Sequence, residues 1–226
     1  MFARAVWLIL RKDLTVEFRS GEIAYTTLFF AVSCILMFAF ALVREGKAPE
    51  DGAAGLLWIA IAFAGTLALG RTFERERQSE TLRALLMAPT ARPAVYVGKL
   101  LGIVALLVCV EVLLVPLVAV LFDARRLLAH PFWLLGILAG GTIGFAAVGT
   151  LFAAMLIRAR TRDVLLPVLL YPVIVPVMIA GVRGTATLLQ PEFDGAVAMF
   201  WLALLGTFDV VFVTLALWTF EAVMTD

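Results

Sequence analysis

The chain has 226 residues, of which 63% are hydrophobic and 15% are charged, and its formal net charge is +1 at pH 7. Water-soluble domains carry roughly 45–50% apolar and about 25% charged residues, so this composition excludes a soluble globular protein. It predicts an all-α integral membrane protein. No linker or change of composition divides the chain, and we expect residues 1–226 to form a single transmembrane domain.

The first 22 residues are expected to form an amphipathic helix that lies in the membrane interface. Apolar residues recur beside Trp7 at every fourth position, namely Val6, Leu10, Leu14 and Phe18. An adjoining face is mostly basic and carries Arg4, Arg11, Thr15 and Arg19. Such a helix places tryptophan at headgroup depth and its basic side chains towards anionic lipid.

Six later segments are long and apolar enough to cross a bilayer, whose hydrocarbon core of about 30 Å needs about 20 apolar residues per helix. They are Ile23–Val43, Ala53–Gly70, Leu100–Phe122, Phe132–Ile157, Val164–Ala180 and Val197–Phe220. The second and fifth are short, which is compatible with a broken or partly re-entrant helix.

The distribution of lysine and arginine predicts the orientation of these spans. Of the 18 basic residues, thirteen fall on the side of the N-terminus and five on the opposite side. The positive-inside rule therefore predicts that both termini are cytoplasmic. The polar stretch Arg71–Arg92, between the second and third spans, lies on the same side.

That stretch, 71–92, is the most charged part of the chain. From Phe73 to Met87 it contains no Gly or Pro and is rich in good helix formers, and Pro89 then marks a stop. Opposite charges three residues apart favour a helix. The residues that we expect to carry a docking function are Glu74, Glu76, Arg77, Glu80, Leu82, Arg83, Leu85, Leu86 and Pro89. A short helix that docks on a soluble partner is one interpretation, and an ordinary interfacial loop is the other.

No catalytic motif accompanies this stretch. The sequence has no Walker-type phosphate loop, no Gly-x-Ser-x-Gly elbow and no His-Glu-x-x-His pair. Its one histidine, His130, cannot form a multi-histidine metal or haem cage by itself, and we interpret it as a solvated loop residue. We therefore expect no catalytic residue and no metal site, and any ATP that is used must be hydrolysed by a partner.

Two spans carry regular patterns of glycine or proline. In the fourth, Gly136, Gly140 and Gly144 form a row of small residues, which predicts close helix packing within the subunit or across a dimer. In the fifth, Pro167, Pro172 and Pro176 predict a kinked or broken helix that acts either as a hinge or as a static bend.

Glu111 and Asp209 lie near the middle of predicted spans, where an ionisable group is costly and suggests a function. Each is either a polar element of a cavity or relay, or a carboxyl that is hydrogen-bonded between helices. No lysine or arginine falls within a predicted span to pair with them. Arg158, Arg160 and Arg162 form a short basic loop, which indicates anchoring to anionic lipid or contact with a partner.

An interfacial helix, six spans and a charged helix after the second span resemble the type-2 export permeases of ABC transporters. The pattern Glu80-x-Leu82-x-x-Leu85-Leu86-x-x-Pro89 is similar to the coupling helix of those permeases, which docks on the ATPase subunit. More specifically, the chain resembles the haem exporter protein B family of cytochrome c maturation complexes. This resemblance is carried by Arg11–Leu14 with Glu17–Arg19, by Phe73–Pro89 followed by Lys99, by Gly149–Phe152 leading through Arg162 to Leu165–Pro167, and by Leu170–Gly181.

The resemblance implies a non-catalytic permease subunit of the bacterial inner membrane that forms a homodimer and docks a cytoplasmic ABC ATPase. It implies haem-handling membrane subunits and a periplasmic haem chaperone as further partners, and no nucleic acid. ATP would bind the partner subunit, and haem would be handled by the complex, with no cofactor on this chain itself. The alternatives are an export permease for another substrate, such as a lipid or drug, and a membrane scaffold that has no ATPase partner.

Overall fold

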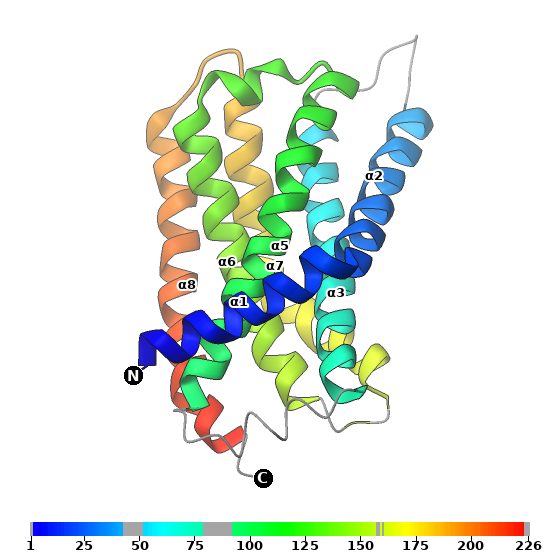
Figure 1. Cartoon of the computed structure of the whole chain (residues 1–226). Coiled ribbons are helices and arrows are strands. Elements are labelled where there is room, and N and C mark those ends of the chain that lie inside the picture. Colours follow the sequence, from blue (N-terminus) through cyan, green and yellow to red (C-terminus); the bar gives the residue numbers. More distant parts are fainter. Residues whose placement is uncertain (1, 43–51, 79–91, 157–158, 160, 224–226) are drawn as a thin grey trace.

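The structure is a computed structural model that describes residues 2–42, 52–78, 92–156, 159 and 161–223. Within these ranges it is helical and contains no strand (Figure 1). The helices are α1 (Phe2–Ser20), α2 (Glu22–Leu42), α3 (Ala53–Gln78), α5 (Arg92–Leu121), the 3-10 helix η2 (Arg125–Ala129), α6 (Pro131–Met155), α7 (Arg162–Leu189) and α8 (Gly195–Val223).

The six predicted spans are confirmed, because α2, α3, α5, α6, α7 and α8 are each long and apolar enough to cross a membrane. The expectation that the second and fifth spans are broken or re-entrant is wrong. α3 continues for 26 residues into the charged stretch, where neither glycine nor proline follows Gly70. α7 continues for 28 residues through all three of its prolines, since neighbouring helices and side chains can accommodate a proline inside a membrane helix.

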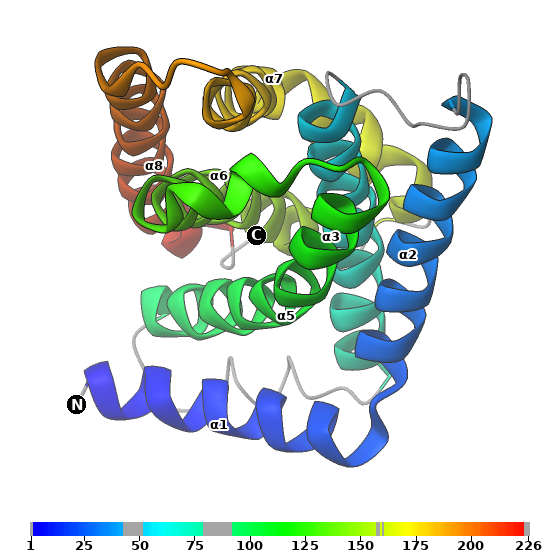
Figure 2. The ribbon, with the colours of Figure 1, turned by 90° about the horizontal axis from the view of Figure 1, so that it is seen from above.

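The helices surround a centre formed by α3 and α6, as seen along the bundle in Figure 2. In the apolar part of α6, 72% of the residues are buried, and in α3 the share is 67%. The corresponding shares for α2 and α8 are 28% and 11%, which places these two helices at the periphery. α1 lies across the bundle rather than along it, as an interfacial helix would (Figures 1 and 2).

The centre is organised by one large side chain, Trp58 of α3, which is 1% exposed. Its indole N–H donates a hydrogen bond to Thr185 Oγ1 of α7 at 2.9 Å. Gly141 of α6 and Gly181 of α7 lie against its ring, and a Cβ added at Gly181 would come within 2.5 Å of it. The two glycines thus make room for an aromatic side chain whose polar group is satisfied.

The glycine row of α6 packs against α8 within the same subunit. A Cβ placed on Gly136 or Gly140 would contact Leu202 or Leu205 of α8, respectively. A Cβ on Gly144 would lie 2.7 Å from Asp209 Oδ1 of α8. Of the two interpretations left open by the sequence, packing within the subunit is the one observed.

α1 packs on α5 through a narrow face near its N-terminus. Val6 and Ile9 are the buried residues of this helix, whereas Phe18 is 87% exposed and lies outside the packed face. α5 allows the close approach at Gly98, where a Cβ would lie 2.8 Å from Ile9 Cγ2. The contact with α5 is centred on Ile9, and Phe18 stays available to the membrane interface in which this helix was predicted to lie.

Candidate functional site

The candidate docking site lies where α3 ends and α5 begins, at the end of the bundle that carries α1, which we call the α1 end. Of the residues expected to dock a partner, Glu74, Glu76 and Arg77 fall on the last turns of α3. The others lie outside the described residues, namely Glu80, Leu82, Arg83, Leu85, Leu86 and Pro89. A docking helix over Glu80–Pro89 therefore stays a prediction, and what the structure describes is how its two attachment points are held.

Arg162, at the N-terminus of α7, fixes the first attachment point. Its guanidinium donates a hydrogen bond to the backbone carbonyl of Gly70, and its Nη1 lies 3.7 Å from Glu74 Oε2. A carbonyl oxygen has two lone pairs, so Gly70 can accept this bond within a helix. Arg162 is 4% exposed. The end of α3 is thus joined to α7 by a buried cation.

The interpretation of Arg158, Arg160 and Arg162 as a basic loop that anchors to anionic lipid or contacts a partner is consequently wrong for Arg162, which is buried and bridges two helices. Arg158 and Arg160 lie outside the described residues.

The second attachment point is the first part of α5. Tyr96 is fully buried there, and its hydroxyl donates a hydrogen bond to the Ala147 carbonyl of α6 at 3.1 Å. The Tyr96 ring also packs against Phe220 of α8, with the ring centroids 5.3 Å apart. One turn further along, Lys99 is 3% exposed and its Nζ lies 2.6 Å from Asp13 Oδ2 of α1. The start of α5 is thereby tied to three other helices.

Asp13 accepts from two cations at once. Its other carboxylate oxygen, Oδ1, lies 2.9 Å from Lys12 Nζ. A buried lysine is tolerated only when its charge is compensated, and Asp13 supplies that compensation for Lys99. The α1–α5 contact therefore combines apolar packing at Ile9 with an ion pair one helical turn further on.

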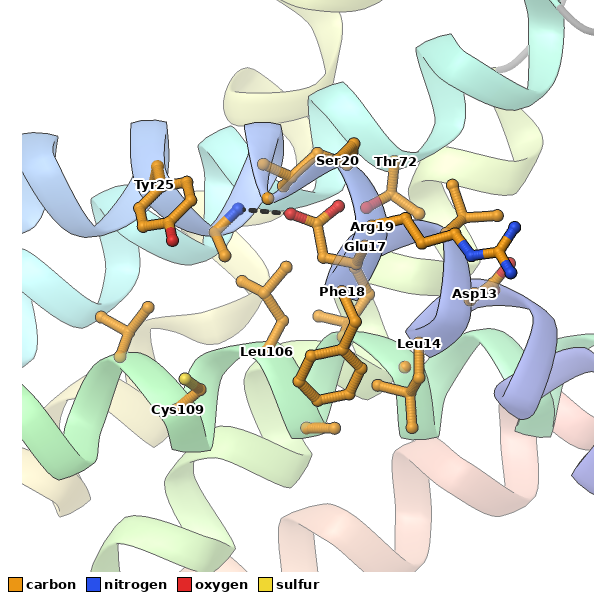
Figure 3. A pocket seen from close by; sticks show the side chains of 18 of the residues that line it. Asp13, Leu14, Glu17, Phe18, Arg19, Ser20, Tyr25, Thr72, Leu106 and Cys109 are labelled. Atoms are coloured by element: carbon orange, nitrogen blue, oxygen red, sulfur yellow. Dashed lines mark hydrogen bonds between the residues drawn. The ribbon is translucent and has the colours of Figure 1, made fainter.

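The corner between α1 and α2 is fixed by Gly21 and Glu17. Gly21 has a φ of +63°, in the left-handed region that favours glycine. The Glu17 carboxylate reaches past this corner and accepts a hydrogen bond of 2.7 Å from the backbone N–H of Ala24 (Figure 3). An anion at a helix N-terminus also interacts favourably with the helix dipole. Glu17 therefore sets the direction in which α2 leaves α1.

The two intramembrane carboxyls lie on opposite sides of α6. Glu111 of α5 is 5% exposed and accepts a hydrogen bond from the Thr142 hydroxyl of α6. Asp209 of α8 faces Gly144, and its buried Oδ1 has no hydrogen-bond partner within the described part of the chain. The structure thus gives Glu111 a neutral polar partner and does not bring the two carboxyls together.

His130 is not merely a solvated loop residue, because it stacks on Phe193 with the ring centroids 4.1 Å apart. Phe193 in turn contacts Trp133, so three rings close the end of the bundle opposite α1. Among the described residues, no group of three or more His, Cys, Asp or Glu could hold a metal ion.

Sequence reasoning missed the two buried cations because their partners lie far along the chain. Lys99 and Asp13 are 86 residues apart, and Arg162 and Gly70 are 92 apart. The available signal was position: each cation lies within two residues of the start of a predicted span, where a charged side chain can be partly buried in the bundle. Asp13 also stands out as an acidic residue directly after Arg11 and Lys12.

Comparison with known proteins identifies the family. The model of the family described as "CcmB protein" matches residues 4–225. The chain belongs to this family. Heme exporter protein B of Rhodobacter capsulatus is 30% identical over 175 residues, which cover 76% of this chain and 78% of that protein.

Two further relatives carry the same name. Heme exporter protein B of Pseudomonas aeruginosa is 26% identical over 199 residues, which cover 87% of this chain and 86% of the relative. That of Escherichia coli K12 is 34% identical over 97 residues, which cover 42% of this chain and 44% of the relative. The family match thus extends over the whole helical bundle, whereas the stronger identity to the E. coli protein covers less than half of either chain.

Proposed function

We propose that this chain is the permease subunit of a haem-export complex that acts in cytochrome c maturation. The observation that carries this proposal is the CcmB family match over residues 4–225, together with relatives named Heme exporter protein B. Six apolar helices make the chain a multi-pass membrane protein. It is a transport subunit rather than an enzyme, and the ATPase resides on a partner.

The proposed coupling route runs through the segment between α3 and α5. Two copies of the chain form a dimer, and each docks one cytoplasmic ATPase through Glu80–Pro89. The proposed orientation, with both termini in the cytoplasm, is supported by the excess of basic residues at the α1 end. The proposed location in the bacterial inner membrane is supported by the family match. ATP hydrolysis then drives release of a haem-loaded periplasmic chaperone, with haem handled by neighbouring membrane subunits.

The anchors at both ends of this segment support a mechanical role. A displacement of the segment by the ATPase reaches α7 through Arg162, which bridges the Gly70 carbonyl and Glu74. The same displacement reaches α1 through Lys99 and Asp13, and α6 and α8 through Tyr96. Rigid, polar contacts at the point of entry transmit a movement better than exposed side chains that can relax in solvent.

Charge reversal tests the docking step. We expect Glu80→Lys combined with Arg83→Glu to abolish co-purification of the ATPase with the chain from detergent-solubilised membranes. Glu192→Lys is the control, because Glu192 is exposed in the connection from α7 to α8, at the end of α7 opposite Arg162. Unchanged association of the ATPase with the double variant would contradict docking through this segment.

Gentle purification tests the substrate. The complex is extracted in mild detergent, every bound protein is identified, and an absorption spectrum is recorded for haem. Haem-handling subunits and a haem spectrum are the expected result. A complex that contains an ATPase alone, without haem, would favour an export permease for a different substrate.

A further inference from the structure

A groove with a volume of about 650 Å³ opens between α1, α2 and α5 (Figure 3). It adjoins the second attachment point of the docking segment, whose Asp13 and Lys99 are among the residues that line it. One wall is the C-terminal half of α1 from Lys12 onward, which continues around Gly21 into the first two turns of α2. The other wall is the stretch of α5 from Lys99 to Val110. Thr72 of α3 also lines the groove.

The groove changes character along its length. The charged side chains of the lining gather at its end beside α1, where Lys12, Asp13, Glu17, Arg19, Ser20 and Lys99 line it together with the apolar Leu14, Val16 and Phe18. Its other end is lined by Leu28, Ile103, Leu106 and Val110. Phe18 and Tyr25 also line it and are 87% and 73% exposed. Polar at one end and apolar at the other, the groove matches the two ends of an amphiphile.

The charges at the polar end leave one cation available. Asp13 is shared between Lys12 and Lys99, and Glu17 is engaged with the N-terminus of α2. Arg19 is exposed and forms no ion pair with any residue in the described ranges. Three cations and two anions line this end, so its formal charge is +1. An anionic group is therefore the favoured occupant of the polar end.

The depth of the groove fits one leaflet of a membrane. Lys99 and Val110 are separated by about 16.5 Å along α5, at the helical rise of about 1.5 Å per residue. Half of a hydrocarbon core is about 15 Å thick. An acyl chain that enters at the level of α1 would therefore lie against α5 across about the whole thickness of one leaflet.

We propose that this groove binds one anionic phospholipid from the leaflet in which α1 lies. The phosphate binds Arg19, and one acyl chain lies between α2 and α5 along Leu28, Leu106 and Val110. A bilayer supplies this amphiphile at the mouth of the groove, and the interfacial position of α1 brings Arg19 to headgroup depth. The site is independent of the substrate that the complex exports.

The two native cysteines provide a test in the unmodified chain. Cys109 is exposed and lines the groove, whereas Cys34 of α2 is not among the residues that line it. The full-length chain is reconstituted into phosphatidylcholine vesicles that contain increasing fractions of phosphatidylglycerol. The rate at which N-ethylmaleimide alkylates each cysteine is then measured by mass spectrometry, with Cys34 as the internal reference. We expect phosphatidylglycerol to slow the alkylation of Cys109 relative to Cys34, with saturation.

Arg19→Gln identifies the headgroup contact. Loss of one charge-assisted hydrogen bond weakens binding about tenfold, so half-protection of Cys109 should require about ten times more phosphatidylglycerol. Arg11→Gln is the matched control: it removes the same charge from an exposed position on α1 that does not line the groove. Equal shifts for the two variants would mean that only the surface charge matters and would overturn the proposal.

A second measurement does not depend on cysteine chemistry. Native mass spectrometry of the chain released from the mixed vesicles should retain one phosphatidylglycerol. Ala105→Phe should lose it, because Ala105 lines the groove and a phenyl ring there would occupy the path of the acyl chain. Retention of the lipid by Ala105→Phe would falsify the site. Protection of Cys109 by added haem, with no effect of phosphatidylglycerol, would assign the groove to a tetrapyrrole and likewise overturn the lipid proposal.

Discussion

α3 and α2 pack side by side, yet the two helices meet their surroundings in opposite ways. In α3, 67% of the apolar part is buried, against 28% in α2. α3 is enclosed by glycine-bearing faces of α6 and α7, with Gly141 and Gly181 lying against Trp58 and Gly149 against Leu69. α2 instead exposes Phe29, Met37 and Phe40. Both helices are strongly apolar, so hydropathy alone does not separate them.

The difference shows what drives association inside a bilayer. Lipid chains are as apolar as the side chains that they contact, so helices gain little from burying hydrophobic surface against each other. Close packing at small residues and satisfied polar contacts remain as driving forces. α3 has both, at its glycine contacts and at the bond between Trp58 and Thr185. α2 has few of these contacts, and its first two turns border the groove.

The largest effect should follow removal of Trp58. Trp58→Ala leaves a cavity between α3, α6 and α7 and deprives Thr185 of its hydrogen-bond donor. In water-soluble cores such a change costs about 3–5 kcal/mol. Here the loss should be somewhat smaller, because the transfer of apolar surface contributes less in a membrane. The melting temperature in detergent should fall by several degrees.

Trp218→Ala is the control for that experiment. Trp218 lies on α8 and is 85% exposed, so its removal leaves the packing of the centre intact. We expect little change in melting temperature. If the two tryptophan variants had the same melting temperature, the packed centre would contribute no more to the stability of the bundle than the periphery does.

An intermediate effect is expected at the ion pair between α1 and α5, and it should be asymmetric. Asp13→Asn leaves the Lys99 ammonium, which is 3% exposed, without the carboxylate 2.6 Å away. Breaking a fully buried pair in this way costs about 3–5 kcal/mol. The Asp13 side chain is 18% exposed, so we expect on the order of 2–3 kcal/mol, somewhat below that range. Lys99→Met should cost only about 1 kcal/mol, because Asp13 retains Lys12 and contact with solvent.

Chemical unfolding in mixed micelles measures both variants and their combination. The double variant Asp13→Asn, Lys99→Met should be more stable than Asp13→Asn alone, because it removes the buried cation that has lost the Asp13 carboxylate. A Lys99→Met variant that is less stable than Asp13→Asn would show that Lys99 holds the α1–α5 contact through other interactions.

Features that depend on residues close together in the sequence could be predicted, and features that depend on residues far apart in the sequence could not. Six spans could be predicted because hydropathy is local and a bilayer imposes the length of a helix. The charged stretch after Gly70 was expected to begin a separate element, but α3 continues through Phe73, which is 2% exposed. The local sequence permits this, since neither glycine nor proline follows Gly70 within α3. The contact that joins this part of α3 to α7, between Arg162 and the Gly70 carbonyl, spans 92 residues, and no local pattern reveals it.

The same limit applies to the candidate sites. The positions of Glu111 and Asp209 could be predicted to lie within spans, but their surroundings depend on helix packing. Glu111 meets the Thr142 hydroxyl, whereas Asp209 meets a glycine. The groove could not be predicted at all, since it arises where α1 turns into α2 beside α5 and is formed by residues that look like ordinary interfacial and membrane-facing side chains.

The smallest effects are expected along the glycine row of α6, where the sequence left its partner open. Replacement by alanine should be nearly neutral at Gly136, because the new methyl would lie 3.3 Å from the flexible end of Leu202 and alanine favours a helix. Gly140→Ala should cost more, because the methyl would lie 3.1 Å from Leu205 Cβ. Gly144→Ala should cost most, about 1–3 kcal/mol of overpacking, since it would meet Asp209 Oδ1 at 2.7 Å as well as Val177 and Phe208. This gradient is a property of the α6–α8 contact within one subunit. Thermal unfolding of the three variants measures this order. The reverse order, with Gly136→Ala the most destabilising, would mean that a second copy of the chain packs on the glycine row. In that case α8 would be peripheral only in the isolated subunit.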